Sequence, residues 1–302
     1  MDNEIKTGQN KKASVSGMLH DFMEHHAPWF WIIFSVVTVL IVYKSFSLTF
    51  LEKTPYTWDD VFQHYTLALL CIILMRESYK GQFHLGFRTE RFGLCLLLCW
   101  PAIPFMLLNL LTSLSDQPII PESLILMLLS NFAIGLFEEV VVRAILVGHM
   151  MHHWKGDKHR VLKSVLCSAL LFGILHIGNF FSNPVGTIFQ IVYASGIGVM
   201  FAAAYIRSRN LWPCIILHAL VDLCANLGHI YVPLQADMAA YQEELMSVPS
   251  LVSYYVPYDV VMMLPGLVLV GAVLISIVAA IAGAFTLRKS KAQEIEALWE
   301  EM

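Results

Sequence analysis

Long apolar runs recur along the chain, and short polar segments separate them. A helix that crosses a bilayer needs about 20 mostly apolar residues. Eight runs meet or approach this length, at residues 29–48, 61–75, 92–112, 124–150, 162–177, 185–206, 211–228 and 260–287. Pro101 and Pro104 are expected to kink the third run, and Pro265 the last, which neighbouring helices tolerate in a membrane. The pattern predicts an all-α, polytopic integral membrane protein with about eight transmembrane helices.

The composition agrees with this pattern. The 302 residues are 57% hydrophobic and 14% charged, and their mean hydropathy is +0.65, whereas soluble domains carry roughly 25% charged residues. The net charge of -4 gives no support to nucleic-acid binding. The 6 cysteines lie in or beside apolar runs and form no C-x-x-C pair. We therefore interpret them as small buried hydrophobic residues.

The basic residues predict the orientation in the membrane, because cytoplasmic loops carry an excess of Lys and Arg. With eight spans, both termini lie on one side of the bilayer. Lys44 and Lys53 fall in loops on the opposite side, Arg143 falls inside a span, and all other Lys and Arg residues fall on the side of the termini. This distribution predicts cytoplasmic termini. The first apolar run shows no clear cleavage site and is interpreted as a retained anchor.

Several ionisable residues fall inside predicted spans, where charged groups are costly and mark functional sites by default. They are Glu138, Glu139, Arg143, His176, His218 and Asp222. Counted from the basic flanks at 1.5 Å per helical residue, Glu138, both histidines and Asp222 lie roughly 14–20 Å inside the membrane. Three helices thus place polar groups at a common depth. This predicts one shared site near the middle of the bilayer.

Helical spacing sorts these residues, because residues four apart share one face of a helix. Glu139 and Arg143 are four apart and can form an ion pair. Glu138 is five residues from Arg143 and remains the freer carboxylate, which makes it the candidate general base. His218 and Asp222 are also four apart, so both can face one pocket.

Two uncharged side chains extend the expected site. Phe172 lies four residues before His176 and can form a wall, and Asn226 continues the face that carries His218 and Asp222. Each polar residue also has a purely structural explanation. A buried Glu–Arg pair, a hydrogen-bonded histidine between helices and a His–carboxylate clip are all compatible with the residues alone.

Three short motifs follow one another along the chain. They are Glu138-Glu139-x-x-x-Arg143, Phe172-x-x-x-His176 and His218-x-x-x-Asp222. In this order they resemble the motifs of the CPBP family (CAAX protease and bacteriocin-processing, or Abi), which includes the type II CAAX prenyl endopeptidases. The resemblance covers about residues 124–228. It implies an all-helical fold of eight spans, a catalytic cavity inside the bilayer, and endopeptidase activity through an attacking water without a covalent intermediate.

The resemblance also implies roles for individual residues. By position, Glu138 and His176 are similar to the residues that activate the water, and His218 to a histidine that helps to hold the oxyanion. Glu139 and Arg143 match supporting positions. One position departs from the pattern, because the best-described peptidases carry Asn where this chain carries Asp222.

Asp222 changes the expected chemistry, because an asparagine donates a hydrogen bond to an oxyanion whereas an ionised aspartate would repel it. Two explanations remain open. Either Asp222 is protonated in the low-dielectric site, or it orients His218 while another donor serves. Asn226, one turn further along the helix, is a candidate for that donor.

No cofactor is expected, although zinc remains an alternative. The family was first described as metallopeptidases, and Glu138, His176, His218 and Asp222 would make a plausible zinc shell. The chain has no H-E-x-x-H motif. The metal-free glutamate mechanism is therefore favoured.

The spans and the motifs together divide the chain into three regions. Residues 1–123 hold the N-terminal cytoplasmic tail and the first three transmembrane helices, and residues 124–228 form the CPBP catalytic core. Residues 229–302 hold an extracytoplasmic loop, the last transmembrane helix and a cytoplasmic tail. The loop at 229–259 contains no Lys or Arg, and it is interpreted either as an interfacial loop on the headgroups or as a lid or partner surface.

The expected function is an intramembrane endopeptidase in a bacterial plasma membrane. Its partners would be the lipid bilayer and a membrane-associated peptide or protein substrate, with no nucleic acid. A proton- or ion-coupled transporter is an alternative, since carboxylate–histidine chains also form relays, but the two halves of the chain show no repeat. A non-catalytic immunity or scaffold protein that keeps the family fold is the other alternative.

Overall fold

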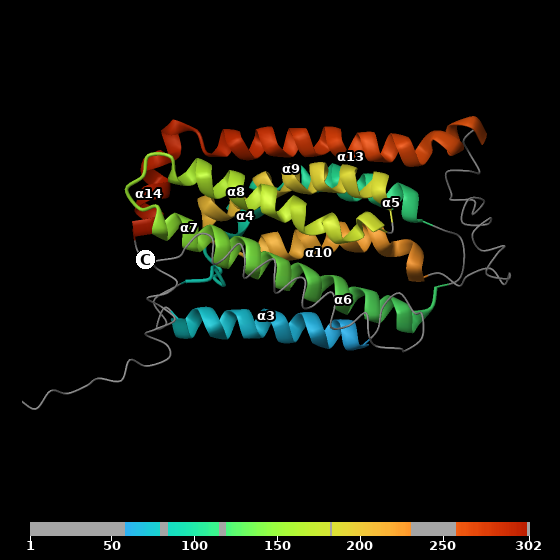
Figure 1. Ribbon diagram of the computed structural model, residues 1–302, viewed down its shortest axis with the longest axis horizontal. Coiled ribbons are helices and arrows are strands. Elements are labelled where there is room, and N and C mark those ends of the chain that lie inside the picture. Colours follow the sequence, from blue (N-terminus) through green and yellow to red (C-terminus); the bar gives the residue numbers. More distant parts are fainter. Residues whose placement is uncertain (1–57, 79–83, 115–118, 182, 231–257, 301–302) are drawn as a thin grey trace, which may run out of the picture.

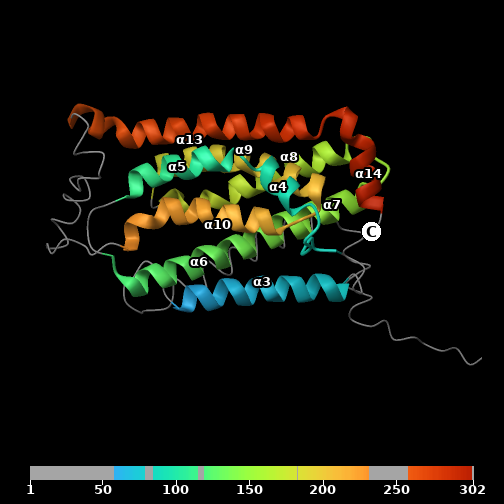
Figure 2. The same cartoon turned by 180° about the vertical axis from the view of Figure 1, so that it is seen from behind.

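The computed structural model describes residues 58–78, 84–114, 119–181, 183–230 and 258–300. Across these residues the chain is almost entirely helical and forms no strand. The long helices run side by side as an elongated bundle, with α3 and α13 on opposite sides (Figure 1, and from behind in Figure 2). The predicted all-α class of fold is confirmed.

The helices differ in length, and short 3-10 or π segments continue several of them. In chain order they are α3 (Trp58–Ser78), α4 (Phe92–Leu98), α5 (Ala102–Ser113), α6 (Pro121–Glu139), η1 (Val140–Val147), α7 (Gly148–His153), α8 (Arg160–Ile174), η2 (Leu175–Phe181), α9 (Pro184–Ser208), α10 (Trp212–Asn226), η3 (Leu227–Ile230), α13 (Tyr258–Thr286), η4 (Lys289–Lys291) and α14 (Ala292–Glu300).

Five helical segments of the described chain are long and apolar enough to cross a membrane. They are Pro121–His153, Arg160–Phe181, Pro184–Ser208, Trp212–Ile230 and Gly266–Thr286. The bent pair α4 and α5 makes a sixth if the two helices form one span. The second predicted run corresponds to α3, whose apolar part, Val61–Arg76, is shorter than a full span. The run at 29–48 lies outside the described residues, so the count of eight is not confirmed.

The third predicted run is a broken helix. Helices α4 and α5 meet at an angle of 62°, and Pro101 stands at the N-terminal boundary of α5. Proline has no backbone N–H to donate and its ring collides with the preceding turn, so a helix stops or bends there. The expected kink near Pro101 is therefore present. In contrast, α13 continues past Pro265 without a break.

The outer faces of α8 and α13 are apolar, and exposed large side chains recur there at the spacing of one helical turn. In water such rows would be costly, whereas lipid chains cover them without loss. The exposed rows therefore fit a bundle that is embedded in a membrane. Their members are Leu162, Leu166, Leu170 and Ile174 on α8, and Val270, Leu274, Ile277, Ile281 and Phe285 on α13.

The basic residues gather at one end of the bundle. The C-terminal ends of α3, α9 and α13 meet there with the start of α8 and with α14 (Figure 1). Every described Lys and Arg except Arg143 lies in or beside the segments at this end. This segregation is the arrangement on which the predicted orientation depends.

Helix α14 docks across this basic end, which the sequence pattern did not predict. The indole N–H of Trp299 donates to the carbonyl of Ile206 over 2.9 Å, and Arg209 lies over the Trp299 ring at 5.0 Å. Glu294 pairs with Arg207 at 3.0 Å. The Arg207 hydrogen bond lowers the pKa of Glu294 below its ordinary value of 4.5. The tail thus joins the ends of several helices.

Candidate active site

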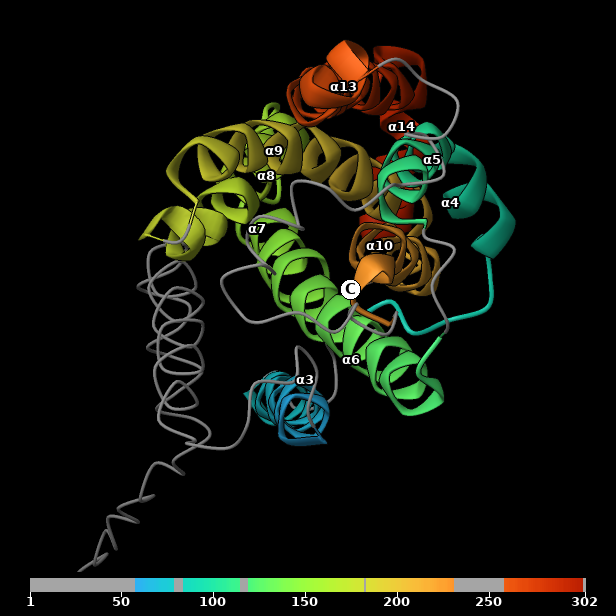
Figure 3. The same cartoon turned by 90° about the vertical axis from the view of Figure 1, so that its right-hand side faces the viewer.

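Helices α6 and α10 approach each other closely beside the predicted site. Figure 3 shows α6 passing between α3 and α10. A Cβ atom on Gly135 of α6 would lie 3.1 Å from the carbonyl oxygen of Ile215 and 3.2 Å from the backbone nitrogen of Ala219 on α10. Any larger residue would have to push the two backbones apart. Glu138 and Glu139 follow Gly135 by about one turn, so this contact brings them to α10.

A π-helix follows these two glutamates directly. Segment η1 (Val140–Val147) carries Arg143, and all of its residues are buried. π-helices are rare and occur frequently at functional sites, because they alter the register of a helix locally. The sequence pattern predicted an ordinary helix here.

His218 is the centre of the polar cluster. Its Nδ1 lies 2.7 Å from Oε1 of Glu139. Its Nε2 lies 3.7 Å from Oε2 of Glu138 and 3.5 Å from Oδ2 of Asp222. A carboxylate only accepts hydrogen bonds, so Nδ1 donates to Glu139. The other nitrogen, Nε2, therefore faces the two remaining carboxylates.

The ion pair expected from the spacing of Glu139 and Arg143 is present. Nη1 of Arg143 lies 3.0 Å from Oε1 of Glu139, and neither side chain is exposed. The Arg143 guanidinium lies 4.2 Å from the ring centre of Phe172 and 5.4 Å from that of Phe201. Cation–π contacts of this kind are worth about 2 kcal/mol when desolvated. The positive charge of Arg143 thus offsets the cost of burying the negative charge of Glu139. The two aromatic rings in turn stabilise the buried guanidinium.

His176 joins the cluster through Phe172. The Nδ1 of His176 lies 2.9 Å from the carbonyl oxygen of Phe172, so Nδ1 donates to that carbonyl. The Phe172 ring packs edge-on against His176 at 5.3 Å and against His218 at 5.6 Å. In the described chain, His176 makes no direct hydrogen bond or ion pair with Glu138, His218 or Asp222. The structure therefore places it beside the carboxylates without a bond to them.

The side chains of His218 and the three carboxylates around it differ in their exposure. The side chains of Glu138 and Asp222 are 31% and 29% exposed, whereas Glu139 is fully buried and His218 is 8% exposed. A water or a substrate can therefore reach Glu138, Asp222 and the Nε2 edge of His218. Glu139 is confined to the supporting side.

Asn226 lies apart from this cluster. Its Nδ2 donates to Oδ1 of Asn131 over 3.1 Å, and Nδ2 of Asn131 donates to the carbonyl of Met127 over 2.8 Å. Asn226 follows His218 by eight residues, which is about 12 Å along a helix. The geometry thus favours a contact between α6 and α10 for Asn226, rather than the oxyanion donor considered from the sequence.

Two residues that shape the cluster were not predicted from the sequence. Phe201 of α9 stacks against His218 at 6.2 Å and forms the second wall for Arg143. Gly135 permits the approach of α6 to α10. A phenylalanine or a glycine in an apolar run carries no signal of its own, and only the packing of three helices reveals the role.

The side chains of the alternative zinc shell are not gathered as closely as three ligands of one ion would be. Within the described residues, one set of three His, Cys, Asp or Glu side chains brings its ligand atoms within 4.8 Å of one another, and it is Cys95, Cys99 and Cys214. The predicted zinc ligands do not form such a set. We therefore derive no catalytic step through a metal.

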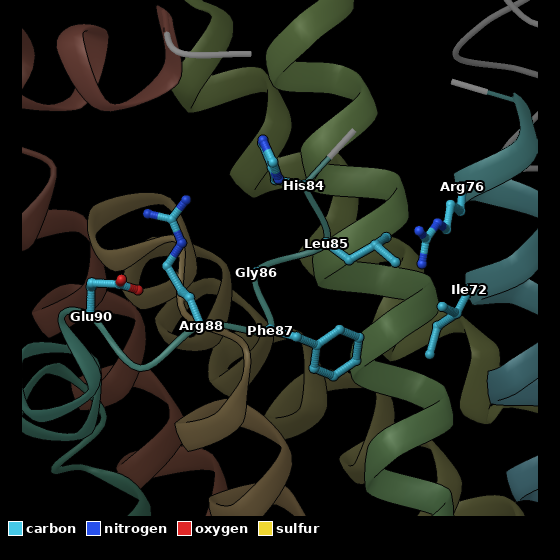
Figure 4. Close-up of a pocket in the computed structure, with 8 residues that line it drawn as sticks. All are labelled: Ile72, Arg76, His84, Leu85, Gly86, Phe87, Arg88 and Glu90. Atoms are coloured by element: carbon cyan, nitrogen blue, oxygen red, sulfur yellow. The ribbon is translucent and has the colours of Figure 1, made fainter. Parts of the chain in front are cut away.

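A cavity of about 610 Å³ opens at the basic end of the bundle, and its lining is separate from the acid–imidazole cluster (Figure 4). Ile72 and Arg76 of α3 line one side, and residues 84–88 with Glu90 line the other. Its charged lining residues are Arg76, Arg88 and Glu90. None of the predicted site residues contributes to it.

The apolar outer faces and the buried acid–imidazole cluster define the class: a membrane-embedded helical protein with a polar centre suited to acid–base chemistry. Residues 120–224 match the family model described as type II CAAX prenyl endopeptidase Rce1-like. The matched segment contains all three motifs and confirms the resemblance seen in the sequence. No curated protein and no solved structure gave a match. The family match supports a CAAX-type intramembrane protease.

Proposed function

We propose that this protein is an intramembrane endopeptidase that cleaves a membrane-associated peptide or protein with a water activated by Glu138 and His176. The observation that carries the proposal is the contrast between two adjacent glutamates. Glu139 is buried and engaged by Arg143 and His218, whereas Glu138 is partly exposed beside His218. Adjacent acids with such different surroundings suit different roles, one supporting and one reactive.

Glu138 is the general base of this mechanism. A general base has to reach the proton that it abstracts, and Glu138 has the accessible carboxylate of the pair. Because Nδ1 of His176 donates to the Phe172 carbonyl, Nε2 of the neutral ring carries the lone pair. It can accept the second hydrogen of the same water and hold that water in place.

His218 stabilises the oxyanion. Glu139 fixes the ring through Nδ1, so that Nε2 faces the accessible side. Donation from Nε2 requires the doubly protonated ring, and the carboxylates of Glu138, Glu139 and Asp222 supply compensating negative charge. Asp222, on the Nε2 side, then orients the imidazolium.

The proton balance closes with these residues. Glu138 takes one proton while the water oxygen bonds to the carbonyl carbon, and the C=O electron pair moves onto the oxygen beside His218. The C–N bond then breaks, and Glu138 returns the proton to the leaving amine. A carboxylic acid and an amine are released, and Glu138 ends as it began.

The test is Glu138→Gln in the full chain. Cleavage should fall by about 10²–10⁴-fold, the usual contribution of a general base, while the protein remains folded. A quenched, prenylated CAAX-type peptide in detergent is one probe, and proteomic comparison of cells with wild type and variant identifies an accumulating precursor. Glu122→Gln is the matched control, since Glu122 is exposed on the same helix. Full activity in Glu138→Gln would end the proposal.

The metal-free form of the mechanism has its own test. Activity should persist after dialysis against EDTA, because no step uses a bound divalent ion. Loss of activity that returns with Zn²⁺ would replace the glutamate mechanism by the zinc alternative.

The location that fits this function is a bacterial plasma membrane, with the basic end of the bundle in the cytoplasm. The support is the concentration of Lys and Arg at that end, which follows the positive-inside rule. A reporter fused after residue 302 should be active only in the cytoplasm, and an extracytoplasmic signal would reverse the assignment.

A further inference from the structure

Three buried cysteines from two distant parts of the chain converge near the break between α4 and α5. Cys95 lies in α4, Cys99 follows its last residue, and Cys214 lies in α10. None of the three is exposed, and their sulfur atoms all lie within 4.8 Å of one another. Burial of these three agrees with the sequence interpretation, whereas Cys167 is exposed. Their convergence was not predicted, because the sequence contains no C-x-x-C motif that would indicate it.

The sulfur–sulfur distances in this cluster distinguish a disulfide bond from a metal site. Sγ of Cys95 and Sγ of Cys214 are 3.8 Å apart, far longer than the roughly 2.05 Å of a disulfide bond. Three thiolates around one ion, each with a metal–sulfur bond of about 2.3 Å, lie about 4.0 Å apart in a trigonal plane. The sulfur–sulfur distances, at most 4.8 Å, therefore exceed the spacing of that arrangement by no more than about 1 Å before any ion binds.

We propose that Cys95, Cys99 and Cys214 form a binding site for a soft, thiophilic cation, with Cu(I) as the best match. Soft sulfur ligands select Cu(I) and Zn²⁺, but structural Zn²⁺ sites have four ligands. The described part of the chain offers three ligand side chains in this cluster. Three sulfur donors suit a three-coordinate monovalent ion.

The neighbouring groups fit a site that can exist with and without the ion. Without it, the thiol of Cys95 donates to the carbonyl of Asn210 over 3.4 Å, and that of Cys214 to the carbonyl of Phe201 over 3.8 Å. Binding replaces the thiol protons by the cation. Cys95 and Cys214 lie one to two turns from Arg91 and Arg209, at the basic end of the bundle, where the cytoplasmic side keeps thiols reduced.

The site is linked to the catalytic cluster through α10. Cys214 and His218 are four residues apart on one face, and Phe201, whose carbonyl accepts from Cys214, stacks its ring on His218. An ion that ties α4 to α10 would therefore hold the helix that carries His218. It would stabilise the fold without touching the substrate.

The experiment measures Cu(I) binding to the purified full chain in detergent, without oxygen and with a phosphine reductant, in competition with a coloured Cu(I) chelator. Wild type should bind about one Cu(I). Cys214→Ser should bind it at least about 100-fold more weakly, because losing even a residue that only hydrogen-bonds to a metal ligand lowers the affinity 10–100-fold. Thermal unfolding with and without Cu(I) is the second readout, and it should show a stabilisation that wild type gains and Cys214→Ser does not.

Cys71→Ser and Cys167→Ser are the matched controls, one buried in α3 and one exposed, and both should bind Cu(I) as wild type does. Cys95→Ser provides a second test if Cys214→Ser does not fold. Equal binding in wild type and in the site variants would overturn the proposal, and so would tight binding of Zn²⁺ without binding of Cu(I). These readouts need no substrate and do not depend on the proposed peptidase activity.

Discussion

Helix α10 carries two polar clusters one turn apart, and they are built on different principles. Around His218, charged groups hold one another through directional contacts, with Glu139 shared between an imidazole and a guanidinium. Around Cys214, thiols are held by packing, with long contacts to backbone carbonyls and to one another. In a membrane the first kind of cluster exists only if each charge has a partner, whereas the second is stable as an apolar core.

This difference predicts different tolerance to substitution. Removing Arg143 from beside the buried Glu139 leaves a buried charge without its guanidinium partner. Removing one thiol leaves behind a small apolar site.

The largest loss of stability is expected for Arg143→Leu. The substitution leaves the fully buried Glu139 with His218 but without its guanidinium partner, and breaking a buried ion pair by removing one partner costs about 3–5 kcal/mol. The measurement is the free energy of unfolding in mixed detergent micelles.

The double variant Glu139→Gln with Arg143→Leu is the control. It removes both charges, so it should recover part of the stability while activity stays low, because His218 loses its charged partner at Nδ1. A single variant as stable as wild type would contradict the role assigned to Arg143.

Gly135→Val should come next. The added side chain would collide with the backbone of Ile215 and Ala219, and overpacking costs about 1–3 kcal/mol. It would also move Glu139 away from His218, so activity should fall more than stability. Gly93→Ala is the matched control, since a Cβ at Gly93 meets nothing within 4 Å. Unchanged activity in Gly135→Val would show that the close approach of α6 and α10 is dispensable.

Cys214→Ser without metal should have a smaller effect. A serine hydroxyl in place of the thiol is more costly to bury, but it can keep a hydrogen bond to the Phe201 carbonyl, so the expected cost is about 1 kcal/mol. The comparison with Arg143→Leu uses the same unfolding measurement. A loss as large as that of Arg143→Leu would mean that the thiol cluster is not a tolerant apolar core.

The smallest effect is expected at the surface, for Glu294. Its lowered pKa means that the pair with Arg207 contributes stability above pH 4.5, and that this contribution is lost as the pH falls below that value. Because Glu294 is 37% exposed, the contribution is about 0.5 kcal/mol or less. Thermal unfolding of wild type and Glu294→Gln should differ slightly near neutral pH and converge in strong acid, below the lowered pKa. A constant difference would contradict the pair.

The sequence predicted the helical membrane fold and the residues around His218, because buried charges in apolar runs are conspicuous. It also predicted the Glu139–Arg143 pair from a spacing of four. The partner of His218 at Nδ1 was missed, since Glu139 lies on another helix and no local spacing relates the two. Phe201, Gly135 and the cysteine cluster were missed for the same reason. They depend on which apolar faces meet, and apolar faces look alike in a sequence.

Segment η1 has a practical consequence for experiments on this helix. Each π turn takes about one residue more than an α turn, so the side chains after Val147 are rotated relative to those before Val140. A helical wheel drawn through Pro121–His153 as one regular helix would assign His149 and its neighbours to the wrong side. Spin labels or cross-linkers should therefore be positioned separately on the two flanks.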